Sequence, residues 1–212
     1  VSKIHGRVSR EMFASLYEGY FPEEIHIGHV TNGVHYPSWA AAPWQQLYEK
    51  AFGEGFLSDQ SNPEYWKKIQ EVPDEKIWEI RNAMRSHLID YVKDRVQIDM
   101  RRRQEDPKTI SRILGSMNPH ALTIGFARRF ATYKRAHLLF TDLERLKALV
   151  NQPGKPVQLI FAGKAHPADK EGQALIKRIM EISKLPDFLG KITFVENYDL
   201  ELGQKLVQGV NI

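Results

Sequence analysis

Cationic side chains are concentrated in one short segment of the chain, Arg128-Arg129-Phe130-Ala131-Thr132-Tyr133-Lys134-Arg135. Four of its eight residues are arginine or lysine, and it directly follows an apolar run that ends at Ala127. Arginine can hold a phosphate through two parallel hydrogen bonds, and lysine adds a mobile point charge. We expect the helix that follows to point its positive N-terminus at the same place. The segment therefore predicts an anion site suited to phosphate.

A basic run of this kind can be either solvated surface or a ligand site. Most such runs are solvated surface, but this one stands at the carboxyl end of a predicted strand, which favours a ligand site. The chain contains neither a G-x-G-x-x-G motif nor a Walker loop, which argues against a dinucleotide or a P-loop nucleotide.

Apolar strands and amphipathic helices alternate around the segment. Strands are predicted at 121–127, 157–163 and 191–197, helices at about 135–150, 168–183 and 200–208, and the start of a further strand at 210–212. This alternation is typical of a parallel, doubly wound sheet, whose ligands bind at the carboxyl ends of strands. After a polar linker near 104–109, the second half is therefore predicted to be a Rossmann-like half-domain.

The first half is predicted to be mostly helical. Its pattern indicates an amphipathic helix over 1–19, a short strand at 25–30, a loop from Asn32 where Asn-Gly signals a turn, and short helices at 43–52 and 63–70. The longest helix would start with Asp74 as its cap and end at Arg101-Arg102-Arg103. Its apolar side would carry Ile77, Ile80, Met84, Leu88, Tyr91 and Met100.

Composition narrows the class of protein. With 42% apolar residues the chain can bury a substantial core, and the absence of cysteine excludes disulfides and thiolate catalysis. No apolar run is long enough for a membrane span, and the first residues lack the features of a signal peptide. We expect a cytoplasmic protein with no membrane partner, and we interpret the chain as an internal piece of a longer one.

The cationic segment, with its flanks, resembles the glycogen phosphorylase family, the α-glucan (glycogen/maltodextrin) phosphorylases. Members carry an Arg-Ile-His-Glu-Tyr-Lys-Arg type segment after the first strand of the C-terminal domain. Further matches follow in the same order along nearly the whole chain, more loosely over 36–120: Val1-Ser2-Lys3-Ile4-His5, Thr31-Asn32-Gly33 followed by Trp39, Ala162-Gly163-Lys164-Ala165 and Glu196-Asn197-Tyr198.

The resemblance implies site roles for particular residues. Arg129 and Lys134 match the pair that binds the substrate phosphate, and they are the expected catalytic residues. His5, Asn32 and Tyr133 match residues that contact the glucose. No metal ligand is expected, and Lys164 is assigned no catalytic role.

The resemblance also implies a cofactor, pyridoxal 5'-phosphate. Trp39 and Tyr198 match residues packed against it, and Arg128 stands where the family has a lysine that touches its phosphate. The lysine that attaches the cofactor is expected beyond Ile212.

The implied fold is α/β, a fragment of a two-domain GT-B-type glycosyltransferase. Residues 1–105 would be the end of the N-terminal catalytic domain with the interdomain helices, and 106–212 the incomplete first part of the Rossmann-like C-terminal domain. Ala131-Thr132 replaces the usual His-Glu, and Tyr198-Asp199 replaces Tyr-Arg. These departures indicate the short, divergent prokaryotic branch.

The implied activity of the parent enzyme is phosphorolysis of α-1,4-glucans such as glycogen, starch and maltodextrin to α-D-glucose 1-phosphate. The partners would be the α-glucan and inorganic phosphate or glucose 1-phosphate, in a parent compatible with a homo-oligomer, whereas the piece alone is expected to be inactive.

Two alternatives remain open. A nucleotide-sugar-dependent glycosyltransferase of the glycogen synthase type shares the R-x4-K spacing of Arg129 and Lys134. A nucleic-acid-binding module would rest on Arg101-Arg102-Arg103, but 26 acidic residues nearly balance the 30 arginines and lysines, so no nucleic acid is expected.

Overall fold

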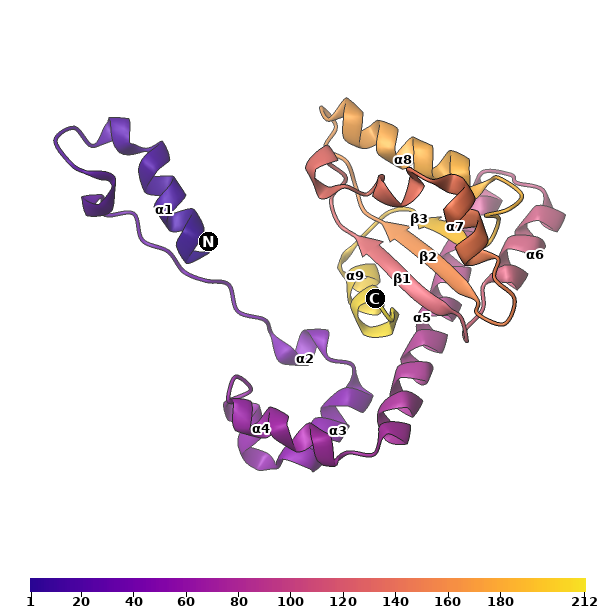
Figure 1. Cartoon of the computed structure of the whole chain (residues 1–212), viewed down its shortest axis with the longest axis horizontal. Coiled ribbons are helices and arrows are strands. Elements are labelled where there is room, and N and C mark those ends of the chain that lie inside the picture. Colours follow the sequence, from indigo (N-terminus) through magenta and orange to yellow (C-terminus); the bar gives the residue numbers. More distant parts are fainter. The chain divides into compact units, whose positions relative to one another are not determined.

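The computed structural model describes residues 1–212 and divides into two compact units, Val1–Pro37 and Ser38–Ile212. Figure 1 traces the chain through its helices and strands. All strands belong to the second unit, where they form a three-stranded parallel sheet between helices. The α/β class predicted from the alternating pattern is confirmed.

The Val1–Pro37 unit is built on one helix, α1 (Lys3–Met12), followed by 3-10 turns at Ala14–Leu16 and Pro22–Glu24. Ser2 caps the helix, since its hydroxyl accepts a hydrogen bond from the His5 N–H. Phe13 leaves the helical conformation, with φ −98° and ψ 8°. The observed helix is therefore shorter than the helix over 1–19 that the apolar pattern predicts.

Residues 26–35 of this unit form neither helix nor strand. Two carbonyl groups of this segment accept hydrogen bonds from α1 and the residues before it. The Val1 amino group donates to the Val30 carbonyl (2.7 Å), and the Arg10 guanidinium donates to the Ile27 carbonyl (3.0 Å). The strand predicted at 25–30 is wrong, because the segment has a helix rather than a second strand as its partner, whereas the loop predicted from Asn32 is confirmed.

The sheet has the order β1 (Leu122–Ala127), β2 (Val157–Ala162) and β3 (Ile192–Val195), all parallel. The register aligns Phe126, Phe161 and Phe194 across the three strands. Since the carboxyl ends of parallel strands share one edge, the residues that follow Ala127, Ala162 and Val195 leave the sheet on the same side.

Helices cover both faces of this sheet (Figure 1). On one face α7 (Leu143–Val150) and α8 (Lys170–Ser183) pack on Leu159 and Phe161 of β2. On the other, α5 (Asp74–Arg102), α6 (Pro107–Ser116) and α9 (Leu200–Gly209) pack on the alternate residues Ile160 and Ala162. The doubly wound arrangement predicted for the second half is present.

The long helix α5 crosses beneath the sheet and packs mainly on α9 and α6. Four of the six residues predicted on its apolar side are buried, namely Ile80, Met84, Leu88 and Met100. Its N-cap is Pro73, so Asp74 is the first helical residue and not the cap, although its charge still suits the first turn.

The predicted linker at 104–109 is shorter than expected, because α6 begins at Pro107. Asp106 caps this helix by accepting a hydrogen bond from the Thr109 N–H (2.9 Å), and proline occupies its first turn. The Asp-Pro pair was the sequence signal for this missed helix.

Residues 210–212 lie at the open edge of β1. The Asn211 N–H donates to the Thr123 carbonyl, and the Gly125 N–H donates to the Ile212 carbonyl, both at 2.8 Å. The buried Arg85 of α5 donates to the Asn211 side chain. The end of the chain therefore takes the strand-like position that its apolar pattern predicted.

The remaining helices of the second unit are α3 (Ala42–Phe52) and α4 (Pro63–Lys67), while α2 (Tyr36–Trp39) spans the boundary of the two units. Aromatic rings join α3 to α4, with Tyr48 and Phe52 stacked at 5.4 Å and Trp66 edge-on to both. Both predicted short helices are confirmed. No helix of the chain combines the length and apolar character that a membrane span needs.

Candidate phosphate site

Phe130 anchors the cationic segment that follows β1. Its side chain is fully buried and contacts the rings of Phe126 and Phe194, while its N–H donates to the Lys164 carbonyl (2.9 Å). The flanking Arg128 and Arg129 are exposed and form no ion pair. One buried aromatic therefore fixes the backbone and leaves two guanidinium groups to solvent.

The loop after β2 approaches this segment so closely that only glycine fits. Gly163 has φ +148°, and a Cβ built on it would lie 2.1 Å from the Arg128 carbonyl oxygen. Gly172, in the first turn of α8, is similarly close to the Phe130 carbonyl. These contacts set the path of the backbone that carries the arginines.

The helix expected directly after the cationic segment is absent there. Thr132–Lys134 form a single 3-10 turn, Arg135 takes a left-handed conformation (φ +58°), and α7 starts only at Leu143 with Asp142 as its cap. The prediction that this helix points its N-terminus at the site is wrong. The left-handed residue stops helix growth, and the Asp142 cap starts the helix later.

Arg129, Tyr133 and Lys134 come together at the surface. The Lys134 Nζ lies 5.2 Å from the centre of the Tyr133 ring, which is 66% exposed as a residue. A hydrogen bond from Arg129, followed by the charge of Lys134, lowers the pKa of Tyr133. The three side chains form an open cationic cluster that an anion can reach.

Trp39 and Tyr198 both contact α9. The Trp39 carbonyl accepts a hydrogen bond from Gln208 (3.5 Å), and a Cβ on Gly203 would lie 2.6 Å from the Tyr198 hydroxyl. Both side chains are half-buried. Their role beside a cofactor, like that of Arg128, stays a prediction.

His5 and Asn32 belong to the Val1–Pro37 unit, and both are exposed. His5 is in the first turn of α1, whereas Asn32 is in the segment without regular structure. Their predicted contacts with glucose stay predictions.

Arg95 of α5 is the residue that the sequence reasoning missed. It donates hydrogen bonds to the Asp199 carboxylate (3.0 Å), to the carbonyls of Glu196 (3.2 Å) and Asn197 (3.0 Å), and to the Tyr91 hydroxyl (3.1 Å). Asn197 is left-handed, with φ +55°. Arg95 therefore holds the loop that carries Tyr198.

Asp199 closes this loop by capping α9, since it accepts a hydrogen bond from the Leu202 N–H (2.8 Å). That bond, the hydrogen bond from Arg95 and the charge of Lys164 all lower the pKa of Asp199. Nothing in the local sequence pairs Asp199 with Arg95, because the two are 104 positions apart.

The basic run at the end of α5 is largely neutralised within the protein. Arg102 pairs with Asp99 (3.5 Å), and Arg103 pairs with Glu105 (3.8 Å) and Glu196. This accounts for two of the three arginines on which the nucleic-acid alternative rested.

A family model described as carbohydrate phosphorylase matches residues 1–212. The chain belongs to the carbohydrate phosphorylase family. Glycogen phosphorylases from Aquifex aeolicus and Mycobacterium tuberculosis are 42% and 40% identical to it over all 212 residues, and a maltodextrin phosphorylase from Thermococcus litoralis is 37% identical. The phosphorylase-family chain spans 30%, 24% and 25% of these proteins, respectively. The family resemblance inferred from the motifs is confirmed.

Proposed function

We propose that the protein containing this chain carries out phosphorolysis of α-1,4-glucans. Inorganic phosphate would attack the terminal glucose and release α-D-glucose 1-phosphate with retained configuration. The observation that carries the proposal is the exposed cluster of Arg129, Tyr133 and Lys134 in a chain of the phosphorylase family.

Arg129 and Lys134 would bind and align the substrate phosphate. A guanidinium and an ammonium group together offset the charge of a phosphate dianion, and their fixed position favours attack along one direction. The buried Phe130 supports this role, because it holds the backbone between them while their side chains stay accessible. Tyr133 would contact the glucose.

Arg128 and Tyr198, which follow β1 and β3, and Trp39 of α2 suit pyridoxal 5'-phosphate as the cofactor. Arg128 offers an exposed guanidinium without an ion-pair partner for its phosphate, and Trp39 and Tyr198 offer half-buried aromatic surface. When bound, the cofactor supplies an acid/base group, its own phosphate, toward the substrate phosphate. Arg128 would hold that phosphate in place, and Tyr198 would support the ring.

The proposal extends to the whole architecture. The sheet of the second unit would be the first part of the C-terminal domain of a two-domain GT-B enzyme, beginning near residue 106. The preceding residues would end its N-terminal domain, with His5 and Asn32 contacting the glucose.

The test uses the natural full-length protein and measures glucose 1-phosphate released from maltodextrin with and without inorganic phosphate, together with bound pyridoxal phosphate. We expect phosphate-dependent release and one cofactor per chain. Arg129→Ala should lower kcat on the order of 10²-fold or more. Arg145→Ala, which removes an exposed arginine of α7 without an ion-pair partner, is the matched control and should be near normal.

If the Arg129→Ala enzyme has a near-normal kcat, Arg129 does not align the substrate phosphate as proposed. Activity with a nucleotide-glucose donor, without phosphate dependence or cofactor, would instead support the glycogen synthase type of transferase.

A further inference from the structure

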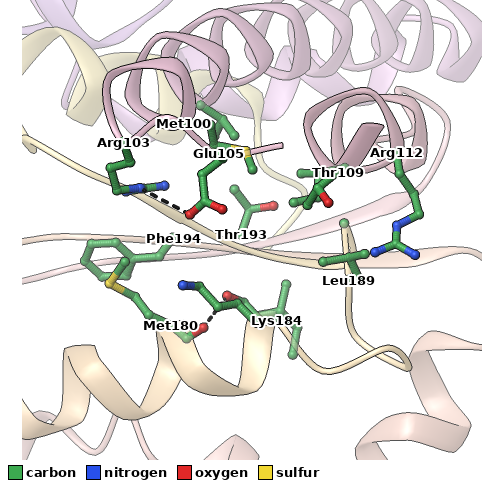
Figure 2. A pocket seen from close by; sticks show the side chains of 15 residues that line it. Met100, Arg103, Glu105, Thr109, Arg112, Met180, Lys184, Leu189, Thr193 and Phe194 are labelled. Atoms are coloured by element: carbon green, nitrogen blue, oxygen red, sulfur yellow. Dashed lines mark hydrogen bonds and ion pairs between the residues drawn. The ribbon is translucent and has the colours of Figure 1, made fainter. Parts of the chain in front are cut away.

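A second group of cations surrounds a cavity of about 240 Å³ at the open edge of β3. The end of α5, α6, the end of α8 and β3 line it, and none of its residues belongs to the candidate phosphate site (Figure 2). Met100, Ile113 and Phe194 provide an apolar surface on which the uncharged part of a ligand can rest. The cavity therefore combines apolar walls with charged side chains.

Two of the cations in the lining have no counter-ion. Arg112 comes from α6 and Lys184 from the end of α8, and neither forms an ion pair or side-chain hydrogen bond. Figure 2 shows them reaching the cavity from opposite walls. Glu105 is the carboxylate in the lining, and it lies 3.8 Å from Arg103. Thr109 and Ser183 also border the cavity, and their hydroxyls already donate to the Asp106 carboxylate (3.2 Å) and the Met180 carbonyl (2.8 Å).

The wall of the cavity depends on a close backbone approach. Gly190 has φ +74°, and a Cβ built on it would lie 2.4 Å from the Cβ of Ser116 at the end of α6. Only glycine lets the chain before β3 pass so near α6, and this places Leu189 in the wall. The cavity is thus a consequence of tight packing between two elements.

We propose that this cavity binds a phosphomonoester of a small neutral molecule. Arg112 and Lys184 match the charge of the phosphate and supply its hydrogen-bond donors, and the apolar wall takes the neutral body. The volume lies below the range of about 300 to 1,000 Å³ typical of drug-sized ligands, so the occupant is smaller than a nucleotide. The proposal does not depend on the proposed function.

Arg103 links the cavity to the loop after β3. Its guanidinium lines the cavity and also pairs with Glu196, two residues before Tyr198. A bound phosphate competes with Glu196 for this guanidinium. Removing the Glu196 charge therefore strengthens ligand binding.

The test is calorimetric titration of β-glycerophosphate, with inorganic phosphate as the comparison. The protein carries Arg129→Gln and Lys134→Gln, which silence the candidate phosphate site. We expect one site per chain that prefers the ester. Adding Arg112→Gln and Lys184→Gln should weaken it at least tenfold, whereas Lys177→Gln with Arg178→Gln, an equally charged exposed pair on α8, should leave it unchanged. Circular dichroism verifies that each variant is folded.

Each result bears on one part of the proposal. Affinity unchanged by Arg112→Gln with Lys184→Gln, or no binding at all, overturns the site. Equal affinity for inorganic phosphate and the ester overturns the ligand class. Glu196→Gln should raise the affinity several-fold, and an unchanged affinity overturns the link through Arg103.

Discussion

The loops after β1 and β3 leave the same edge of the sheet, but their charged side chains have different partners. After β1, Arg128 and Arg129 are exposed and form no ion pair, and a buried Phe130 holds the backbone. After β3, both acidic residues are paired: Glu196 with Arg103, which caps the end of α5, and Asp199 with Arg95 of α5.

The difference shows that some charged side chains stabilise the fold whereas others remain available to bind a ligand. A charged group with an internal partner stabilises the fold at its own position, whereas one without a partner keeps its electrostatic potential for an incoming ion. Position at a strand's carboxyl end is therefore insufficient to mark a ligand site. The absence of an internal counter-charge is the additional criterion, and of the two loops compared it is met by the one after β1.

The strongest test of the β1 loop is Gly163→Ala. The new Cβ would meet the Arg128 carbonyl in a backbone conformation that alanine avoids, so we expect the free energy of unfolding to fall by about 3 kcal/mol. Urea unfolding measures the change. The control is Gly154→Ala, where φ is also positive (+74°) but no atom lies within 4 Å, and a loss of only about 1 kcal/mol is expected. Equal losses would show that the close approach is unimportant.

Arg95→Met tests the β3 loop. It removes the Arg95 donor from the Glu196 and Asn197 carbonyls and from one oxygen of the Asp199 carboxylate, and we expect a loss of about 2 kcal/mol in the free energy of unfolding. Arg129→Met, in contrast, should change it by less than about 0.5 kcal/mol. Similar losses in the two variants would break the contrast between the loops.

The pH dependence of stability provides a smaller effect. Because the folded pKa of Asp199 lies below its ordinary value of 3.8, its contribution is fully present above pH 3.8 and disappears as the pH falls through the folded pKa. We expect the stability difference between the wild type and Asp199→Asn to shrink in that acid range. Denaturant unfolding from pH 6 downwards measures it, and a difference independent of pH would contradict the prediction.

The smallest effect is expected at the exposed Tyr133. Its pKa is lowered chiefly by the hydrogen bond from Arg129, so Arg129→Gln should move the phenol pKa back up toward its ordinary value. Titration of the Tyr133 ring signals by NMR measures this. Lys147→Gln is the control, because it removes a cation of α7 that pairs with Asp187 and does not contribute to the Tyr133 shift. It should leave the Tyr133 pKa in place.

Much of the sheet region could be predicted because its signals are local. All three strands, α5, α8 and α9 follow apolar patterns within single segments, and each is present. The errors occurred where a partner or a single residue overrode the pattern. Residues 25–30 have strand composition but pack along a helix. The helix expected from residue 135 begins only at Leu143, because Arg135 has a left-handed backbone conformation.

The candidate site shows the same division. Arg129, Tyr133 and Lys134 could be grouped in advance because they lie within six consecutive residues. The contacts of Arg95 with Asp199 and of Arg103 with Glu196 join residues 104 and 93 positions apart, and no local pattern announces them.

The sequence by itself determined the family, the parallel α/β region and the cationic segment, because each is carried by residue types in a contiguous order. The tertiary structure alone decided which charges are neutralised and which remain available, where glycine is obligatory, and that Arg112 and Lys184 share a cavity. The physical reason is that ion pairing, close backbone approach and cavity shape depend on distances between segments, which only the folded chain sets.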